Sequence, residues 1–417
     1  PNSPMPIMDL RNGKDELQFL KRNDLEELST RGTASPDHVI RIKGRPLILK
    51  ESVWSRGREA IKEELDKYAK EYKAMFERQA PKADQPKTML PTDPKNIWME
   101  GIGLIGLGAN AKAASIAGDL VVQNARVRAI GEDAGGFRPI SEKDLFDCEY
   151  WSLEQAKLGK GTPPKFQGKI VMITGGSGTI GFAIAKAFSK LGAQTILVDK
   201  DEIALKESVA KLGVGHKYFP IDVTHSDAAN QAMLAAINNF GGLDILISNA
   251  GAAHAGPMLG ISNEELRNAF ELNFFSHYSF STEAAKILKD QNRGGQILFN
   301  ISKQAVNPGK NFGAYGLPKA TTFFLMRQLA LELGSDGIRV NGINADRIRS
   351  GLLTDDFISS RAKSRGVSES EYMAGNLLNK EVTAEHVADA FTALACAEST
   401  TGHVMTVDGG NIEASLR

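Results

Sequence analysis

The stretch that decides the fold is Lys169–Gly181, KIVMITGGSGTIG. It begins with an apolar, β-branched run at residues 170–173, which is typical of a buried strand. The run breaks into glycines at residues 175–178, and apolar residues then return at helical spacing from Ile180 onward. A strand, a glycine turn and a helix start can bind a pyrophosphate, because the backbone approaches the phosphates closely and free N–H groups face the anion. Asp199 closes the next predicted strand, at the distance where an acidic residue accepts a hydrogen bond from an adenine ribose.

Strand and helix patterns alternate regularly from residue 169 to the end of the chain. Strands are predicted at 169–174, 194–199, 217–221, 244–248, 296–301, 338–343 and 403–407. Helices are predicted to begin near Ile180, Glu202, Ser226, Asn263, Tyr315 and Thr383. This alternation predicts an α/β fold, a Rossmann-type doubly wound parallel sheet of about seven strands with helices on both faces.

The chain before residue 159 follows a different pattern. Helices are predicted at 61–75, 109–130 and 141–158, the last with a capping box from Ser141 to Asp144, and a loop at 82–94. The run GKGTPPKFQG at 159–168 has the composition of a linker. We therefore expect a smaller α/β domain at 1–158, a linker at 159–168 and the doubly wound domain at 169–417.

A second glycine motif lies in the front part of the chain. Gly101–Gly106 also matches G-x-G-x-x-G, but no regular strand–helix series follows it, and no acidic residue closes a second strand at the expected distance. We expect a buried strand and turn here.

The composition narrows the classes of partner. Fifty basic residues balance fifty acidic ones in 417 residues, so we expect neither nucleic acid nor an anionic membrane surface as a partner. No apolar stretch reaches the ~18 residues of a membrane span. Cys148 and Cys396 are the only cysteines, so no disulfide framework is expected, and a cytoplasmic location fits. Pro1–Leu10 lacks the form of a secretory signal, and a start at proline suggests processing or a longer parent chain.

Further polar residues follow the predicted strands in a fixed order. Asn249–Gly251 follows the strand at 244–248, Asn273 lies in a helical stretch, and Ser302 ends the strand at 296–301. Tyr315 and Lys319 stand four residues apart, which places them on one face of a helix. A phenol with a pKa near ~10 needs a neighbouring positive charge before it can act as an acid or base at neutral pH.

With these motifs in this order, residues 169–417 resemble a short-chain dehydrogenase/reductase. The resemblance implies that Tyr315 is the general acid/base and that Lys319 lowers its pKa and holds the nicotinamide ribose. It further implies that Ser302 binds the substrate oxygen and that Asn273 holds a water in a proton relay from Lys319. The cofactor contacts it implies are Gly175, Ser177, Gly178, Thr179, Ile180, Asp199, Asp222, Val223, Asn249, Ala250, Gly251, Tyr315 and Lys319.

Several of these residues have a purely structural alternative. Asn273 can cap or kink a helix, Asp199 can be a turn residue, and Asp222 can cap the helix expected near Ser226. A lone Y-x-x-x-K pair also occurs by chance in many proteins.

The chain departs from the common pattern of the family at three positions. Thr179 stands where that pattern has glycine, so the glycine spacing is that of the extended branch. Asp346 replaces a proline after the strand at 338–343. Pro318 precedes Lys319 and is tolerated if it falls in the first helical turn.

The coenzyme is expected to be NAD rather than NADP. Asp199 accepts a hydrogen bond from a ribose 2′-hydroxyl and repels a 2′-phosphate, although Lys200 follows immediately and weakens this preference.

Three stretches outside this core resemble fusions of a class II aldolase with a short-chain dehydrogenase, which are linked to rhamnulose 1-phosphate cleavage and lactaldehyde oxidation. They are residues 30–38, 149–158 and 376–382. His38 is the only histidine before residue 200, and one histidine cannot make a zinc site. Residues 1–158 are therefore expected to be a partial class II aldolase-like domain that lacks the metal ligands, through truncation or loss, with His38 structural or on the surface.

The leading hypothesis is an NAD-dependent oxidoreductase acting on lactaldehyde or another small, sugar-derived aldehyde or alcohol. By analogy with the family, a homodimer or homotetramer is expected. Residues 346–378 are expected to form the substrate lid, and its cationic side chains either face solvent or meet an anionic substrate. They are Arg347, Arg349, Arg361, Lys363 and Arg365. The alternatives are class II aldolase activity of a longer parent protein and a non-catalytic NAD-binding module.

Overall fold

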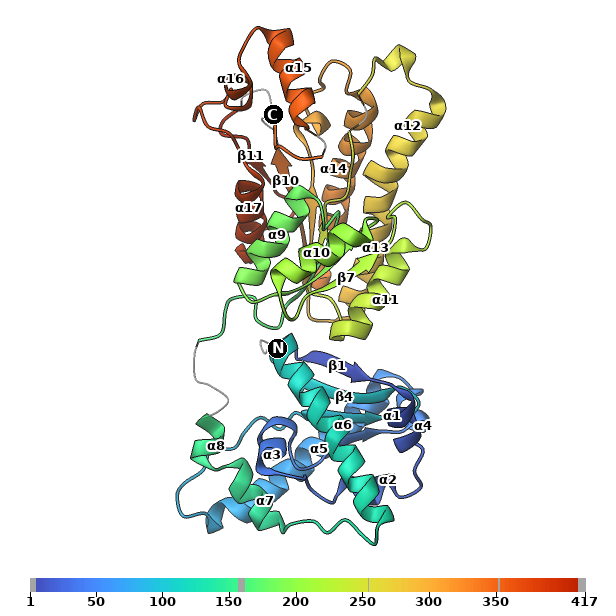
Figure 1. Ribbon diagram of the computed structural model, residues 1–417, viewed down its shortest axis with the longest axis vertical. Helices are drawn as coiled ribbons and strands as arrows, with labels where there is room; N and C mark the ends of the chain where they lie inside the picture. Colours follow the sequence, from blue (N-terminus) through green and yellow to red (C-terminus); the bar gives the residue numbers. More distant parts are fainter. Residues whose placement is uncertain (1–4, 157–161, 254, 352, 412–417) are drawn as a thin grey trace. The chain divides into compact units, whose positions relative to one another are not determined.

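The computed structural model describes residues 5–156, 162–253, 255–351 and 353–411, and Figure 1 shows their course. They fall into two compact units that divide between Pro163 and Pro164. No helix within these ranges is both long and apolar enough to cross a membrane.

The first unit is built on a four-stranded sheet with the order β1-β4-β3-β2. Its strands are β1 (Ile7–Arg11), β2 (Leu47–Leu49), β3 (Asn96–Met99) and β4 (Gly103–Gly108), and β4 runs antiparallel to both of its neighbours. Its helices are α1 (Lys14–Phe19), α2 (Leu25–Ser29), α3 (Pro36–Ile42), α4 (Glu51–Trp54), α5 (Arg58–Gln79), α6 (Ala111–Asp133), α7 (Glu142–Glu149) and α8 (Ser152–Ala156).

The glycine motif of the first unit packs a helix against a strand. A Cβ on Gly106 would run into the backbone of Gly118 on α6. The glycines of β4 therefore let α6 lie close to the sheet, and the expectation of a buried strand and turn at Gly101–Gly106 is confirmed.

The helix predictions for this unit hold with two corrections. The stretch predicted as one helix at 141–158 is α7 and α8, because the chain turns at Tyr150, whose ring stacks on Phe146; residues 157–158 lie outside the described ranges. Ser141 accepts a hydrogen bond from the Asp144 N–H, but its hydroxyl donates to the Asp144 carboxylate, so the reciprocal capping box does not form.

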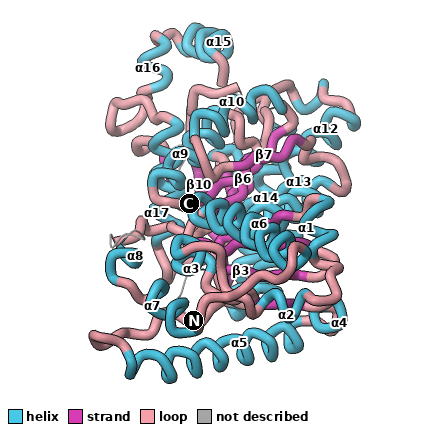
Figure 2. The backbone as a smooth tube through the Cα atoms, turned by 60° about the horizontal axis from the view of Figure 1, so that its bottom comes forward, coloured by secondary structure: helices cyan, strands magenta, loops and turns pink. Residues whose placement is uncertain are grey.

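The second unit contains a seven-stranded sheet with the order β11-β10-β9-β8-β5-β6-β7 and only parallel pairs. Its strands are β5 (Ile170–Thr174), β6 (Gln194–Asp199), β7 (Lys217–Pro220), β8 (Ile245–Ser248), β9 (Gly295–Asn300), β10 (Ile338–Ala345) and β11 (Val404–Val407). Its helices are α9 (Thr179–Lys190), α10 (Glu202–Leu212), α11 (Ala228–Phe240), α12 (Asn263–Phe270), α13 (Ser276–Gln291), α14 (Gly313–Leu333), α15 (Asp355–Arg365), α16 (Glu369–Met373) and α17 (Ala384–Cys396). The predicted doubly wound parallel sheet is confirmed, and Figure 2 shows its strands lying among the helices.

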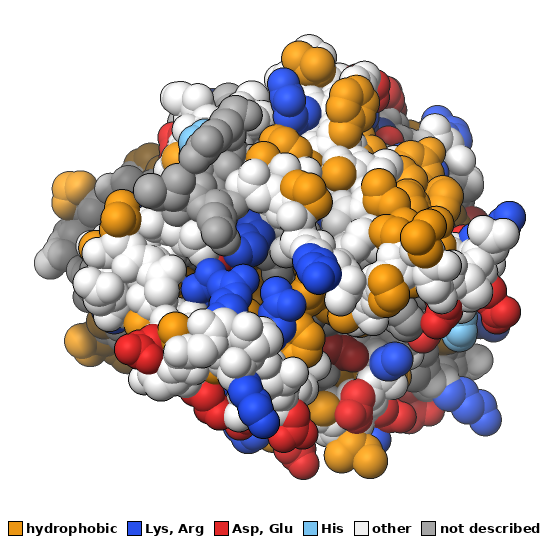
Figure 3. All heavy atoms as spheres, turned by 90° about the horizontal axis from the view of Figure 1, so that it is seen from above, with side chains coloured by type: hydrophobic (Ala, Val, Ile, Leu, Met, Phe, Trp, Pro, Cys, Tyr) orange, Lys and Arg blue, Asp and Glu red, His pale blue; other side chains and the backbone are white. Residues whose placement is uncertain are grey.

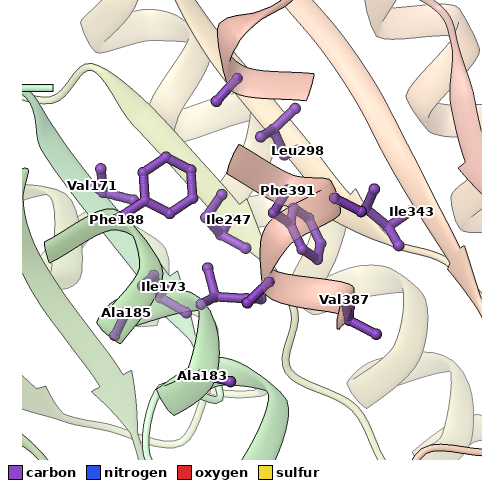
Figure 4. Packing of buried hydrophobic residues seen from close by; sticks show 14 of the residues in the cluster. Val171, Ile173, Ala183, Ala185, Phe188, Ile247, Leu298, Ile343, Val387 and Phe391 are labelled. Atoms are coloured by element: carbon purple, nitrogen blue, oxygen red, sulfur yellow. The ribbon is translucent and has the colours of Figure 1, made fainter. Parts of the chain in front are cut away.

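One face of this sheet packs against α9 and α17. Phe188 of α9 and Phe391 of α17 are fully buried with Ile247 and Leu298 of the central strands, and Figure 4 shows their side chains in one apolar cluster. Phe166, which the sequence analysis places in the linker, is also buried here, with its ring centroid 5.3 Å from that of Phe188. Residues 159–161 of that linker lie outside the described ranges.

Two helix starts lie two residues from their predicted positions, and the helix predicted from Asn263, which begins there as α12, is interrupted. The helix expected near Ser226 begins at Ala228, after Asp227. The stretch from Asn263 is divided into α12 and α13 by a π-helical turn at Glu271–Phe275. Because α14 begins at Gly313, Pro318 falls in the second turn instead of the first, so the helix loses one internal hydrogen bond there.

Candidate active site

The glycine turn after β5 forms a cradle at the start of α9. Gly175 has a positive φ of 64°, which favours glycine, and a Cβ on Gly181 would run into the carbonyl oxygen of Gly175. The first intrahelical bond runs from Phe182 N to Gly178 O at 2.8 Å, so the preceding N–H groups at 179–181 lie ahead of the helical ladder. The turn can therefore bind an anion at the helix N-terminus.

The cradle lies where the strand order reverses. β5 and β8 are neighbours, and the chain leaves them toward opposite edges of the sheet, which opens a crevice at their carboxyl ends. Asn249 bridges the two strands, because its N–H bonds to Thr174 Oγ1 at 2.9 Å and its amide donates to Thr174 O at 2.9 Å. Ala250 N also donates to Thr174 Oγ1 at 3.0 Å, and Gly251 continues the same turn.

Two carboxylates line the far end of the crevice. Asp199 Oδ2 accepts from the Ser177 hydroxyl at 2.7 Å and from its N–H at 3.2 Å, which ties the end of β6 to the cradle. Asp222 accepts from the N–H and hydroxyl of Thr224 at 3.0 and 2.7 Å, and these bonds hold the pKa of Asp222 below its usual range. Asp222 thus closes a local turn beside Val223 and does not cap α11.

Tyr315 and Lys319 lie on the buried face of α14. Burial raises the pKa of the Tyr315 phenol to about 12, and a hydrogen bond with Ser302 opposes this rise. Lys319 is also buried, and burial lowers the pKa of its ammonium to about 8. The expectation that Lys319 leaves Tyr315 with a lowered pKa is therefore not met here. The pKa of Tyr315 rises because the buried phenol loses its contact with water, which disfavours the charged phenolate. The Lys319 Nζ lies 5.8 Å from the centroid of the Tyr315 ring.

Lys319 is held by groups that the sequence analysis did not single out. Its Nζ donates to Asn300 O at 3.1 Å and lies 3.4 Å from His277 Nε2. The other ring nitrogen of His277 lies 2.6 Å from Ser248 Oγ. Burial, together with the neighbouring ammonium, holds the pKa of His277 well below its usual range, so the imidazole is neutral. The spacing of Asn273 and His277, four residues apart on a helical stretch, is a signal that could have placed both on one face.

Asn273 lies in the π-helical turn with its side chain pointing to the loop after β8. Its amide exchanges hydrogen bonds with the backbone of Ala252, accepting at 3.2 Å and donating at 3.0 Å. Its carbonyl oxygen accepts from Thr322 Oγ1 of α14 at 2.7 Å. The alternative role as a helix kink thus has support, because this residue joins α12, α13 and the loop at Gly251.

One cavity joins the cradle to the buried face of α14. It has a volume of about 630 Å³ and extends from the cradle and Asp199 to Ser302, Tyr315 and Lys319. Its shape and donors fit a dinucleotide, since it offers anion-binding N–H groups in the middle, a carboxylate at one end and a phenol with an ammonium at the other. Of the predicted site residues, Ser177 is not among those that line the cavity, and Asn273 lies behind Gly251.

The front unit holds no comparable arrangement among its described residues. His38 is buried and bonded through Nδ1 to Ser35 Oγ at 2.7 Å, a structural position. Within the described ranges, no group of three His, Cys, Asp or Glu side chains is placed to hold a metal ion.

Comparison with known proteins gives two family matches. Residues 176–411 match the model described as enoyl-(acyl carrier protein) reductase, and residues 2–158 match the model described as aldolase class II, second domain. The chain is 30% identical over 422 residues to the uncharacterized oxidoreductase YuxG of Bacillus subtilis, which covers 97% of this chain but 61% of that protein. The chain thus spans less than two thirds of the length of this relative.

Further similar proteins cover about three fifths of this chain. Secoisolariciresinol dehydrogenase of Forsythia intermedia is 30% identical over 257 residues, covering 59% of this chain and 90% of that protein. Among solved structures, 3-ketoacyl-(acyl-carrier-protein) reductase of Brucella melitensis, complexed with NADH, has a TM-score of 0.52 at 25% identity and covers 58% of this chain and 98% of its own. A short-chain type dehydrogenase/reductase of Mycobacterium ulcerans has a TM-score of 0.54 at 29% identity, covering 60% and 90%.

Proposed function

Because the chain belongs to the short-chain dehydrogenase/reductase family and is an NAD(P)-dependent oxidoreductase, we propose that it uses NAD, with Tyr315 as the general acid/base, on a small hydroxy or carbonyl compound. Lactaldehyde or another sugar-derived aldehyde or alcohol is the proposed substrate. The observation that carries the proposal is the convergence of Ser302, Tyr315 and Lys319 on the cavity that begins at the glycine cradle.

The residues that would hold the coenzyme are those of the cradle and of the loops after β6, β7 and β8. Asp199 would accept from the adenine ribose, the N–H groups at the start of α9 would face the pyrophosphate, and Lys319 would hold the second ribose. A bound nicotinamide supplies the hydride donor or acceptor of the reaction.

The protein's own groups supply the proton. With a pKa raised to about 12, the Tyr315 phenol is protonated at neutral pH and can donate to a carbonyl oxygen of the substrate. Ser302 holds the phenol and can bind the same oxygen. In the oxidative direction Tyr315 must first release its own proton, and the phenolate then takes a hydroxyl proton of the substrate, which for lactaldehyde is one on its hydrate. Lys319, with a pKa near 8, loses a proton more easily than an exposed lysine and lies beside His277 as the next group inward.

Two further proposals follow the family. We propose that residues 1–158 and 169–417 are separate domains, in line with the two compact units. We also propose a homodimer or homotetramer, because α14 carries large apolar side chains that face solvent, with Phe324 69% and Leu331 82% exposed.

Replacing Tyr315 by Phe tests the proposal. Substrates are first found by following NADH and NADPH absorbance with lactaldehyde, sugar aldehydes and polyols. In the variant, NADH binding, measured by NADH fluorescence, should persist while turnover falls by at least ~100-fold, the scale of a lost general acid or base. Tyr278→Phe on α13, which removes a phenol outside the cavity, is the control. Unchanged turnover in Tyr315→Phe would exclude this phenol from the chemistry.

A further inference from the structure

The end of the cavity beyond Tyr315 is strongly cationic. Its lining residues there include Lys303, Arg347, Arg361 and Arg365. Among the described lining residues, the one carboxylate at this end is Asp346, since Asp199 and Asp222 lie at the opposite end, after β6 and β7. Figure 3 shows Lys and Arg side chains gathered in the middle of the face seen from above.

Asp346 forms ion pairs with two of these cations. Its carboxylate lies 3.2 Å from Lys303 Nζ and 3.4 Å from Arg347 Nε. Arg347 also donates to the carbonyl oxygen of Tyr372 at 2.7 Å. These two side chains therefore have partners within the protein and are held at the wall of the cavity.

Arg361 and Arg365 have no such carboxylate. Within the part of the chain that the structure describes, neither forms an ion pair, and Arg361 Nε is buried without a hydrogen-bond partner. They lie over aromatic rings instead: the Arg361 guanidinium carbon is 5.8 Å from the centroid of Phe312, and that of Arg365 is 5.2 Å from the centroid of Tyr372. Stacking on a ring leaves the N–H edges of a guanidinium available for a planar or tetrahedral oxyanion.

The two arginines are held in place by the fold of the lid. They stand one helical turn apart on α15, so they share a face. The same helix buries Ile358 and Ala362 against Tyr372 and Met373 of α16 in a small apolar cluster. The lid is thus a packed structure that fixes where these cations point.

Arg361 also lies close to the proposed acid/base. The ring of Phe312 that it faces belongs to the residue just before α14, and the carbonyl oxygen of Phe312 accepts from Tyr315 N at 3.1 Å. Arg361 and Arg365 both line the cavity that Tyr315 lines, so a small molecule that fills this cavity meets these cations on the lid side.

We propose that Arg361 and Arg365 form an anion subsite that binds a phosphate or carboxylate group of the substrate. This inference rests on the proposed function and narrows it. Among small hydroxy and carbonyl compounds, the preferred substrate carries a negative charge at a position away from the reacting carbon. A substrate limited to neutral lactaldehyde would leave both stacked guanidinium groups at the cavity wall without an anionic partner, and Arg361 Nε is buried without a hydrogen-bond partner among the described residues.

Paired substrates that differ in one anionic group test the subsite. The pairs are glyceraldehyde with glyceraldehyde 3-phosphate, glycerol with glycerol 3-phosphate and, for a carboxylate, glycerol with glycerate. We expect kcat/KM of the intact protein to be at least tenfold higher for the anionic member of a pair than for the neutral one. Whether the phosphate pairs or the carboxylate pair show the larger ratio identifies which anionic group the subsite binds. Arg361→Gln and Arg365→Gln should each lower kcat/KM for the anionic member at least tenfold more than for the neutral one.

Lys363→Gln is the matched control. Lys363 stands between the two arginines on α15, is exposed and does not line the cavity, so the variant removes the same charge from the same helix. If Lys363→Gln lowers kcat/KM for the anionic member as much as Arg361→Gln does, the effect comes from the overall positive charge of the lid, and the proposed subsite is overturned. A raised NADH dissociation constant in Arg361→Gln, with the substrate preference unchanged, would assign Arg361 to the coenzyme and overturn it as well.

A binding measurement separates this proposal from the proposed function. Calorimetry with glycerol 3-phosphate and with glycerate, in the presence of NADH, does not depend on turnover. Anion binding that is lost in Arg361→Gln, in a protein that turns over none of the compounds, would support the subsite and contradict the function. Turnover of neutral and anionic members with equal kcat/KM, without anion binding, would support the function and contradict the subsite.

Discussion

Replacing Asp199 by Asn is expected to shift coenzyme preference from NAD toward NADP. Asp199 ends β6 and lines the cavity beside the cradle. Besides the two groups of Ser177, its carboxylate accepts from Lys200 N at 2.8 Å. Asn keeps the shape and one of the two acceptor oxygens but removes the negative charge that a 2′-phosphate would meet.

The expected size follows from Coulomb's law. Two unit charges about 4 Å apart repel by about 1 kcal/mol in bulk water and about 4 kcal/mol at the effective dielectric near a protein surface. Asp199 is half-buried, which places it between these limits. Since each ~1.4 kcal/mol is a factor of ten, the ratio of kcat/KM for NAD to that for NADP should fall by at least about fivefold, the factor that corresponds to about 1 kcal/mol.

The ratio is measured with one substrate and both coenzymes in parallel, and Ser177→Ala is the control. Ser177→Ala removes the hydroxyl that donates a hydrogen bond to Asp199 Oδ2 at 2.7 Å but keeps the negative charge of Asp199. An acceptor position of the carboxylate then becomes available to the ribose, so the preference for NAD should remain. The reasoning is refuted if Asp199→Asn keeps the ratio of the intact protein. It is also refuted if both variants shift the ratio equally, since the shape of the cradle would then set the preference.

Two other substitutions address buried titratable groups. His277→Phe removes the nitrogen that lies 3.4 Å from Lys319 Nζ, so the pKa of Lys319 should fall below about 8. The alkaline limb of the pH profile of kcat/KM should then move to lower pH. An alkaline limb at the same pH in the variant would show that His277 only fills space. Burial raises the pKa of Glu149 from 4.5 to about 7, so its contribution to stability is complete below pH 4.5 and is lost as the pH rises to 7. As the pH rises across this window, the free energy of unfolding of the parent protein should fall relative to that of Glu149→Gln. Tryptophan fluorescence can follow this, because all three tryptophans lie before residue 152, and an equal slope in both proteins would contradict it.

The sequence predicted most of the sheet of the second unit because its signals are local. Each strand is a short apolar run, and the turn at Gly175 and the pair formed by Tyr315 and Lys319 are set by spacing along one element. The burial of Tyr315 was not accessible in this way. Its raised pKa depends on how α14 packs, and a spacing rule carries no information on the water that a side chain loses.

The same limit applies to the lid and to Lys319. The sequence showed five cationic residues between 346 and 378, but not that Asp346 pairs with Lys303 and Arg347 while Arg361 and Arg365 lack a carboxylate. Ion pairing is a property of tertiary structure, since Lys303 lies far from the lid in sequence. The contact of His277 with Lys319 joins α13 to α14 in the same way.

The two glycine motifs of this chain, at Gly101–Gly106 and at 175–181, are alike in sequence but serve different structural purposes. In β4 the neighbour that needs the missing Cβ is the backbone of α6, whereas at Gly181 it is the carbonyl of the chain's own turn. Glycine spacing therefore reports that two backbones come unusually near, whatever lies between them. The direction of the adjacent strands separates the two cases, because β4 has antiparallel neighbours and β5 has parallel ones that open a crevice. A search for nucleotide sites by motif would gain more from testing strand direction than from a stricter glycine pattern.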